Sequence, residues 1–425
     1  MSGPTRYRIA LVALLLTALV AVGGCPPPAA PKEPVSPAVP PPPSKTKATS
    51  GPEESTGSGL SGLATAQFAP NVPDIKVGAY LALSGPQATF GQSTRKAIEL
   101  AADEINAAGG IGSKQITLIV KDDRSRKEDA ASCVRMLIDQ DKVDAILGEV
   151  ASSNSLAAAP LCQEAGVPMI TPSSTNPRVT QVGDCIFRVC FIDDFQGEVM
   201  ARFVRNTLQA QKAAILTDLA NDYSVGLGKR FREVFTELGG QIVAGDTSYA
   251  EGDKDFSGPL TKIAAADPDV LFVPGYYTDV ALVAKQAKTH GLRATICGGD
   301  GYDSPKLVEL AGEAANGLYF SDHCWKGDPS PTVRNFYQAY QAKHGAEPDA
   351  LAALGYDAMY VLAHAFARAG STDKAAVRDA LAGTREFAGV TGTFSIDAQR
   401  NAKKAAVVLT IKDGAQALAE TIPAD

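Results

Sequence analysis

The sequence lacks the short motifs that mark the common catalytic machineries. It has no G-x-x-x-x-G-K-[ST] phosphate-binding loop, no G-x-S-x-G turn for a nucleophilic serine and no H-E-x-x-H zinc motif. Its histidines do not have the spacing of metal ligands; they are His290, His323, His344 and His364. A catalytic triad can still be assembled from distant residues. The absences therefore favour a protein that is not an enzyme and that needs no metal or cofactor.

The chain also has no surplus of positive charge. Its 40 Lys and Arg residues are outnumbered by 47 Asp and Glu residues, which gives a net charge of −7. This balance argues against nucleic acid as a partner and against a basic face that binds membranes.

The N-terminus carries an apolar run that is too short for a comfortable membrane span. Arg6 and Arg8 precede the run at 9–22, whereas a spanning helix needs about 20 residues. This pattern is typical of a secretory signal peptide. It ends in Val22-Gly23-Gly24-Cys25, which resembles a lipobox with Val in place of the usual Leu. We expect a lipoprotein signal peptide at 1–24, lipidation of Cys25 and a periplasmic or extracytoplasmic protein anchored to the cell membrane. The alternative is an ordinary signal peptide and a chance cysteine.

Proline dominates the segment that follows. Residues 26–72 hold 12 of the 27 prolines, and no apolar period is present. Such a segment buries too little apolar surface to offset the entropy of ordering the chain. We expect a disordered tether at 25–73.

Six cysteines follow Cys25, and an even number outside the cytoplasm permits disulfides. Six cysteines allow 15 pairings. Cys297 and Cys324 lie near the ends of two consecutive predicted strands, so we favour that pair. Buried free thiols are the alternative.

From residue 74 onwards, apolar strands alternate with amphipathic helices. Strands are expected at 76–83, 116–121, 144–148 and 167–171, and after 195 at 213–217, 241–245, 270–273 and 295–298. The alternation predicts an α/β protein with parallel sheets that are covered by helices on both faces. Because the pattern starts twice, we predict two Rossmann-like lobes joined by a multi-strand hinge.

The C-terminal part contains more helices than the second lobe needs. Helices at 333–344, 349–369 and 374–382 are expected to return and cover the first lobe, and the strand at 404–411 to cross back again. This assigns 74–193 plus 325–402 to lobe 1 and 194–324 plus 403–425 to lobe 2. Hinged pairs of this kind close on ligands.

Several segments resemble one known family. KVGAYLALSGPQATFGQSTRKAIELAADEINAAGG, GEVASSNSLAAAPLCQEAGVPMITPSST, GDKDFSGPLTKIAAADPDVLFVPGYYTD and LAALGYDAMYVLAHAFARAG occur in this order. They are similar to type I periplasmic solute-binding proteins, specifically the branched-chain (leucine/isoleucine/valine) amino-acid-binding group of ABC transporters. The resemblance implies a monomer with an amino acid in the interlobe cleft and a transporter permease as partner.

The resemblance also implies a set of ligand-binding residues. By motif they are Phe90, Ser152, Ser173, Thr175, Tyr223, Tyr276 and Asp300. The family usually has Glu at the position of Asp300. The shorter side chain of Asp leaves room for water or a differently placed amine, so the identity of the ligand stays open.

The chemistry of these positions agrees with such a role. Ser152 lies at a helix start, where unpaired N–H groups favour anions, and Ser173 and Thr175 follow a strand. Asp300 stands among glycines at a strand end, where ligands of α/β sheets collect. The alternatives are helix capping for the hydroxyls, a turn role for the aspartate and plain core packing for Phe90.

The sequence thus predicts capture of an amino acid, branched-chain or otherwise aliphatic, and its delivery to a permease. A sensor for a small amide or carboxylate with the same fold is the alternative.

Overall fold

The computed structural model describes residue 60 and residues 62–424. The predicted signal peptide at 1–24, the lipidation site Cys25 and most of the tether lie outside the described residues.

The first sheet has five parallel strands in the order β2-β1-β3-β4-β5. They are β1 (Ile75–Leu81), β2 (Ile116–Asp122), β3 (Ala145–Leu147), β4 (Met169–Thr171) and β5 (Ile186–Arg188). The helices between them are α1 (Ala88–Ala107), α2 (Lys127–Met136), α3 (Ser152–Glu164) and α4 (Arg178–Gln181). β1 is buried at every residue except Lys76, as expected for a parallel strand with helices on both faces.

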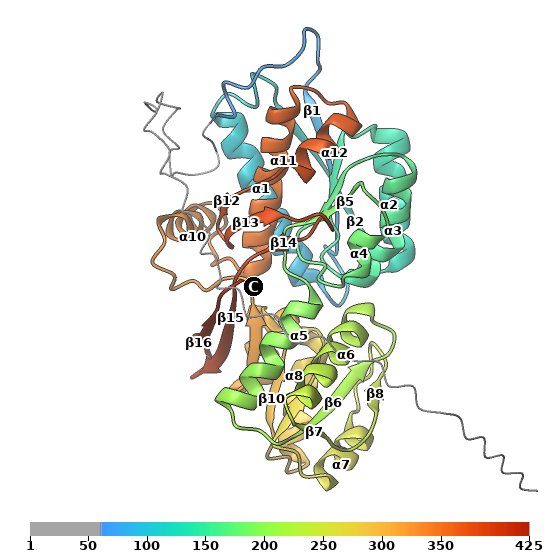
Figure 1. The fold of residues 1–425 in the computed structure, drawn as a ribbon, viewed down its shortest axis with the longest axis vertical. Helices are drawn as coiled ribbons and strands as arrows, with labels where there is room; N and C mark the ends of the chain where they lie inside the picture. The colour runs from blue at the N-terminus through green and yellow to red at the C-terminus, as the bar shows by residue number, and fades with distance from the viewer. Residues whose placement is uncertain (1–59, 61, 425) are drawn as a thin grey trace, which may run out of the picture. The chain divides into compact units, whose positions relative to one another are not determined.

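The second sheet continues the same alternation with eight strands. Six are parallel: β6 (Lys212–Asp218), β7 (Gln241–Ile242), β8 (Thr247–Tyr249), β9 (Val270–Phe272), β10 (Thr295–Gly298) and β11 (Tyr319–Asp322). β15 (Ala406–Lys412) and β16 (Ala415–Ile422) extend it antiparallel beyond β11. Its helices are α5 (Asp193–Arg202), α6 (Asp222–Glu237), α7 (Ser257–Ala265), α8 (Tyr277–Thr289) and α9 (Pro305–Ala311). We call each sheet with its helices a lobe (Figure 1).

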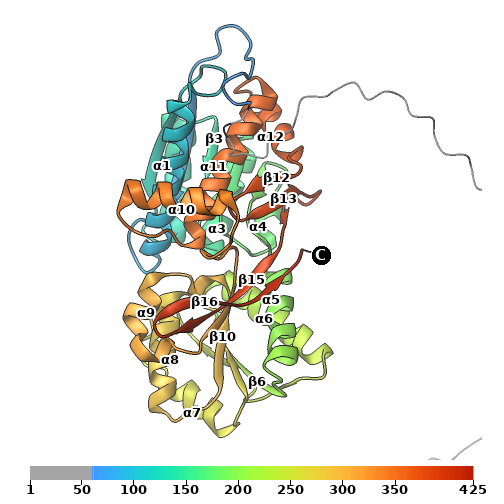
Figure 2. The same cartoon turned by 90° about the vertical axis from the view of Figure 1, so that its left-hand side faces the viewer.

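The chain passes between the lobes after β5, after β11 and before β15. α10 (Pro331–His344), α11 (Ala350–Ala369) and α12 (Lys374–Ala382) lie on the first lobe (Figure 2). Tyr356 and Tyr360 of α11 donate hydrogen bonds to Glu104 of α1 at 2.6 and 2.8 Å. The C-terminal helices thus lie against the first lobe, and the last predicted strand, now β15, pairs with β11 in the second sheet.

α11 is long and apolar enough to cross a membrane, the one such helix in the part of the chain that the structure describes. Because 83% of its apolar window is buried inside the fold, it is a core helix of the first lobe.

Several strands were not predicted, among them β5 and β8 in the two parallel sheets. Besides β16 at the sheet edge, β12 (Phe387–Gly389), β13 (Gly392–Ile396) and β14 (Ala402–Lys403) form a small antiparallel sheet before the last crossing. Except for β16, these strands have two to five residues, which offer too few positions for an alternating pattern to stand out.

The predicted limit of the tether at residue 73 is wrong. Leu63 is 1% exposed and packs in the core. Its carbonyl accepts a hydrogen bond from Gly112 N–H at 2.8 Å, and Ala69 N–H donates to Gly370 O at 3.3 Å. The residues from 62 onwards therefore belong to the first lobe, because they bury apolar surface and satisfy backbone groups there.

The favoured disulfide is also wrong: the six described cysteines are all buried and free. Cys297 of β10 lies opposite Tyr319 of β11. Asp322, at the end of β11, is three residues farther along, or about 10 Å at the rise of a strand, and Cys324 comes after it. A disulfide needs Cα atoms within about 7 Å, so this register keeps the two thiols apart.

Candidate functional site

The seven side chains singled out from the sequence come together around one small cavity. Phe90, Ser152, Ser173, Thr175, Tyr223, Tyr276 and Asp300 line it, and Val150, Gly301 and Leu351 complete the lining. Each of the seven lies in the connection or first helical turn that follows a strand: β1, β3 and β4 in the first lobe, and β6, β9 and β10 in the second. The carboxyl ends of parallel strands are where α/β folds collect ligands.

The cavity has a volume of about 10 Å³, which is room for about one water molecule. Its walls come from both lobes. A larger ligand therefore enters only when the lobes separate, and the structure represents a closed state.

The first lobe supplies hydroxyl groups and the start of a helix. Ser152 begins α3, whose N-cap residue Ala151 makes no side-chain cap. Thr175 Oγ1 is buried and makes no short hydrogen bond among residues 60 and 62–424, but its interaction with the Asp193 carboxylate lowers the pKa of that acid. Ser173 Oγ donates to Val150 O at 3.1 Å. Free N–H groups at a helix start together with nearby hydroxyls favour an anion such as a carboxylate.

A buried arginine, missed in the sequence, holds the loop that carries these hydroxyls. Arg188 of β5 is fully buried. Its guanidinium donates to Ser174 O and to Asn176 O, the latter at 2.8 Å, and reaches Thr180 Oγ1 at 3.4 Å. The shape of the Ser173–Thr175 segment thus depends on a side chain that does not line the cavity.

The second lobe supplies one carboxylate, Asp300, which is 5% exposed. Its Oδ2 lies 3.1 Å from His323 Nε2. Burial lowers the pKa of His323 to about 4, so its imidazole is neutral at pH 7, and the hydrogen on Nε2 is donated to the carboxylate. Asp300 Oδ1 is buried without a partner in the described part of the chain. That oxygen is available to a cation in the cavity.

Gln196 of α5, also missed, positions the Asp300 loop. Its side-chain oxygen accepts from Asp300 N–H at 3.3 Å and from Ser321 Oγ at 2.9 Å, and its Nε2 donates to Asp193 Oδ1 at 2.8 Å. Burial raises the pKa of Asp193 to about 7, and the charge of Asp300 contributes to the rise. Asp193 does not line the cavity, whereas Asp300 does, so Asp300 is the carboxylate within reach of a cation there.

Aromatic rings form the remaining wall. Tyr223 and Tyr276 stack at 5.2 Å with an interplanar angle of 4°, and Phe90 meets Tyr276 edge-on at 5.7 Å. Tyr223 OH accepts from Gly301 N–H at 3.2 Å. The rings enclose an apolar space beside the polar groups.

Comparisons with known proteins agree with this geometry. A family model described as periplasmic binding protein matches residues 74–416. The chain belongs to the periplasmic binding protein family.

Individual relatives and solved structures indicate which group within this family the chain resembles. An amino acid binding protein of Pseudomonas aeruginosa is 32% identical over 323 residues, 75% of this chain and 84% of that protein. Leu/Ile/Val-binding protein homolog 3 of Brucella melitensis is 31% identical over 336 residues, 79% of this chain and 89% of that protein. The crystal structure of a leucine binding protein LivK from Thermotoga maritima has a TM-score of 0.79 at 41% identity, covering 82% of this chain and 99% of that one. LivJ of Streptococcus pneumoniae, solved in complex with isoleucine, has a TM-score of 0.78 at 38% identity with the same coverage.

These findings confirm the resemblance to the branched-chain amino-acid-binding group and the type I periplasmic-binding fold with its parallel sheets. They also confirm that the protein is a solute-binding protein and not an enzyme. Periplasmic binding proteins of ABC transporters are extracytoplasmic.

In this periplasmic binding protein, one residue links the closed lobes through several bonds. Asp222 begins α6, and all its partners here belong to the first lobe. Ser153 Oγ donates to Asp222 Oδ2 at 3.0 Å and accepts from Asp222 N–H at 2.9 Å. Asn176 Nδ2 donates to Asp222 O at 2.7 Å, while Arg178 lies 2.9 Å from the carboxylate and Lys127 lies 3.8 Å from it. These bonds between the lobes can form only when the cleft is closed. We call Asp222 and its bonds to the first lobe the latch.

Proposed function

We propose that this protein captures an amino acid with an aliphatic, branched-chain or similar side chain in the interlobe cleft and delivers it to the permease of an ABC transporter. The unpartnered, buried Oδ1 of Asp300 carries the proposal. A buried carboxylate oxygen without a partner favours a cation beside it, and an α-ammonium group is the cation that isoleucine, the ligand in the LivJ complex, possesses.

The other walls suit the rest of an amino acid. The start of α3 with Ser152, and the Thr175 hydroxyl beside it, suit the α-carboxylate. Phe90, Val150 and Leu351 offer an apolar surface for the side chain. Because ligand groups on both lobes are satisfied together only when the cleft is closed, ligand binding shifts the population towards the closed state.

The membrane anchor, the monomeric state and the bounds of the lobes belong to the same proposal. The lipobox-like Val22–Cys25 segment supports a lipid anchor at Cys25, so that a monomer tethered to the membrane meets its permease. The lobes would comprise 74–193 plus 325–402 and 194–324 plus 403–425, with residues from 62 added to the first.

The first prediction concerns ligand-dependent stability. The mature chain carrying Cys25→Ser, screened by thermal shift, is expected to melt a few degrees higher with leucine, isoleucine or valine at 100 times the dissociation constant. Ligand at that excess stabilises by about 2.7 kcal/mol. Calorimetry then gives the dissociation constant. Stabilisation only by ligands without an amine would contradict an amino acid as the ligand, and no stabilisation by any amino acid would overturn the proposed function.

The second prediction concerns the latch. Asp222→Ala removes several hydrogen bonds that only the closed state makes, so it should lower the closed population. We expect amino-acid affinity to fall roughly 5- to 30-fold, about 1–2 kcal/mol, mainly through faster dissociation. Stopped-flow kinetics measure this. Asp246→Ala is the matched control, because Asp246 is exposed and pairs with Arg232 inside the second lobe. Equal dissociation rates in the two variants would show that Asp222 does not hold the cleft.

A further inference from the structure

The lobes are joined at a second place besides the latch, around the start of α1. Tyr277, the first residue of α8, donates its hydroxyl to Pro86 O at 2.9 Å, and the same hydroxyl oxygen accepts from Thr89 N–H at 3.4 Å. Thr89 Oγ1 also lies 3.0 Å from Ser304 Oγ. Because Pro86 and Thr89 belong to the first lobe and their partners to the second, these bonds form only when the cleft is closed.

The start of α11 is joined to the second lobe in the same way. Asp303 is 3% exposed, and its Oδ2 accepts a hydrogen bond from Ala350 N–H at 2.6 Å. Its other oxygen accepts from Gln416 Nε2 of β16, so the second lobe itself holds the carboxyl group that meets α11. We call Tyr277, Asp303 and Ser304, with their bonds to the first lobe, the second latch.

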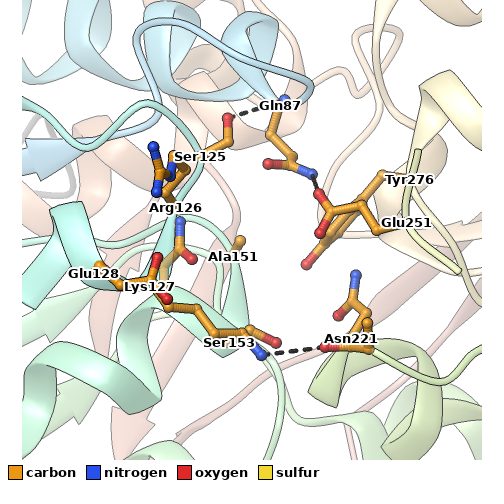
Figure 3. Close-up of a pocket in the computed structure, with 12 residues that line it drawn as sticks. Gln87, Ser125, Arg126, Lys127, Glu128, Ala151, Ser153, Asn221, Glu251 and Tyr276 are labelled. Carbon is orange, nitrogen blue, oxygen red and sulfur yellow. Dashed lines mark hydrogen bonds between the residues drawn. The ribbon is translucent and has the colours of Figure 1, made fainter.

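The two latches are distinct contacts between the lobes. A cavity of about 230 Å³ lies between the lobes, with lining residues from both. On one side of it Gln87, next to the second latch in the chain, donates from Nε2 to Glu251 Oε1 at 3.2 Å (Figure 3). On another side lie Ser153 and Asn221, the partner and the chain neighbour of Asp222 (Figure 3).

The latch bonds to the direct chain neighbours of two pocket residues. Its partners Ser153 and Asn176 follow Ser152 and Thr175 in the chain. Both of these pocket residues carry hydroxyls that we assign to the ligand's α-carboxylate. The latch therefore closes the part of the pocket that all amino acids share.

The second latch bonds to the neighbours of two other pocket residues. Its partners Thr89 and Ala350 precede Phe90 and Leu351, which belong to the apolar wall of the pocket. Phe90 also meets the ring of Tyr277 edge-on at 4.9 Å. The second latch therefore closes the part of the pocket that we assign to the ligand's side chain, where amino acids differ.

We propose that the second latch determines which side chains the protein accepts. The inference rests on the proposed function, because the walls are assigned to the side chain of a bound amino acid. A side chain that fits lets Phe90 and Leu351 reach their closed positions, and the second latch then forms. A larger side chain keeps these walls apart, so the bonds of the second latch are lost, while the latch closes around either ligand. Tyr277, Asp303 and Ser304 thus determine specificity although they do not line the pocket.

The test compares leucine with the larger phenylalanine by calorimetry on the mature Cys25→Ser chain and its variants. Tyr277→Phe removes the hydroxyl that bonds Pro86 and Thr89 but keeps the ring. We expect leucine to bind roughly fivefold more weakly and phenylalanine to stay within about twofold, so the preference for leucine narrows. Thr89→Val removes the hydroxyl that meets Ser304 and should weaken leucine alone by roughly threefold. Methionine takes the place of phenylalanine if the latter binds too weakly to measure.

Two controls separate side-chain selection from closure in general. Asp222→Ala should weaken leucine and phenylalanine by the same factor, because the latch lies beside the groups assigned to the α-carboxylate. Thr261→Val removes an exposed hydroxyl whose bond to Ser257 O, at 2.7 Å, stays within α7. It should change the binding of neither ligand.

Each outcome decides the question. Equal losses for the two ligands in Tyr277→Phe and Thr89→Val would overturn the proposal, because the second latch would then only assist closure. Unchanged leucine binding in both variants would overturn it as well, and so would a parent chain that binds leucine and phenylalanine equally. The two substitutions lie on different elements, so a folding defect in one leaves the other to decide. Failure of every amino acid to bind the parent chain would overturn the proposed function too.

Discussion

Asp300→Ala should weaken amino-acid binding by about two to four orders of magnitude while the protein remains folded. The variant removes the one carboxylate that lines the pocket. The ligand's ammonium would then be buried without a counter-charge, and breaking a buried pair in this way costs roughly 3–5 kcal/mol. Calorimetry with leucine or isoleucine measures the loss, and circular dichroism with thermal melting checks the fold.

Two further variants separate the charge of Asp300 from its shape. Asp300→Asn keeps the size of the side chain but not its charge, and we expect most of the loss to remain. Asp413→Ala, which changes an exposed turn residue of the second lobe, should bind as the parent does. A dissociation constant for Asp300→Ala within a fewfold of the parent value would show that the ammonium binds elsewhere. Asp193, the neighbouring buried acid, would then be the first position to examine.

The pocket lining could be predicted because it follows strands. Apolar runs located the strands, and their carboxyl ends meet in a parallel α/β fold. At those ends the sequence has residues with recognisable roles: hydroxyls before a helix at Ser152, glycines around Asp300 and an aromatic at Tyr276. The residues alone left a capping role open for Ser152 and a turn role open for Asp300. The family resemblance selected the set, and the structure brings it together around one cavity.

The groups behind the pocket could not be predicted, because their partners are distant in the sequence. His323 is 23 residues from Asp300, and the sequence shows it only as one of four scattered histidines. Gln196 reaches Asp300 across 104 residues. Arg188 occupies a three-residue strand, where a charged residue obscures an apolar pattern. No local rule of periodicity or capping refers to such contacts, although a buried polar network is what fixes the orientation of a binding group.

Arg188→Met should lower the free energy of unfolding by roughly 3 kcal/mol and weaken ligand binding at the same time. The guanidinium donates to the carbonyls of Ser174 and Asn176, and hydrogen bonds to charged groups contribute about 1.5–3 kcal/mol each. Methionine fills much of the volume but leaves these buried carbonyls unpaired. The loop with Ser173 and Thr175 then loses its shape, so the groups proposed for the ligand's α-carboxylate are displaced.

Urea unfolding and calorimetry on the same samples distinguish this supporting role from direct contact. Asp300→Ala should change affinity with little change in stability, whereas Arg188→Met should change both. Arg188→Lys keeps the charge but lacks the planar fork that reaches two carbonyls at once, so we expect an intermediate loss. Arg232→Met, at an ion pair whose Asp246 partner is 93% exposed, should stay within about 0.5 kcal/mol of the parent. If Arg188→Met unfolds at the same urea concentration as Arg232→Met, the buried arginine does not hold the loop, and the hydroxyl side of the pocket must be positioned by α3 and β4 alone.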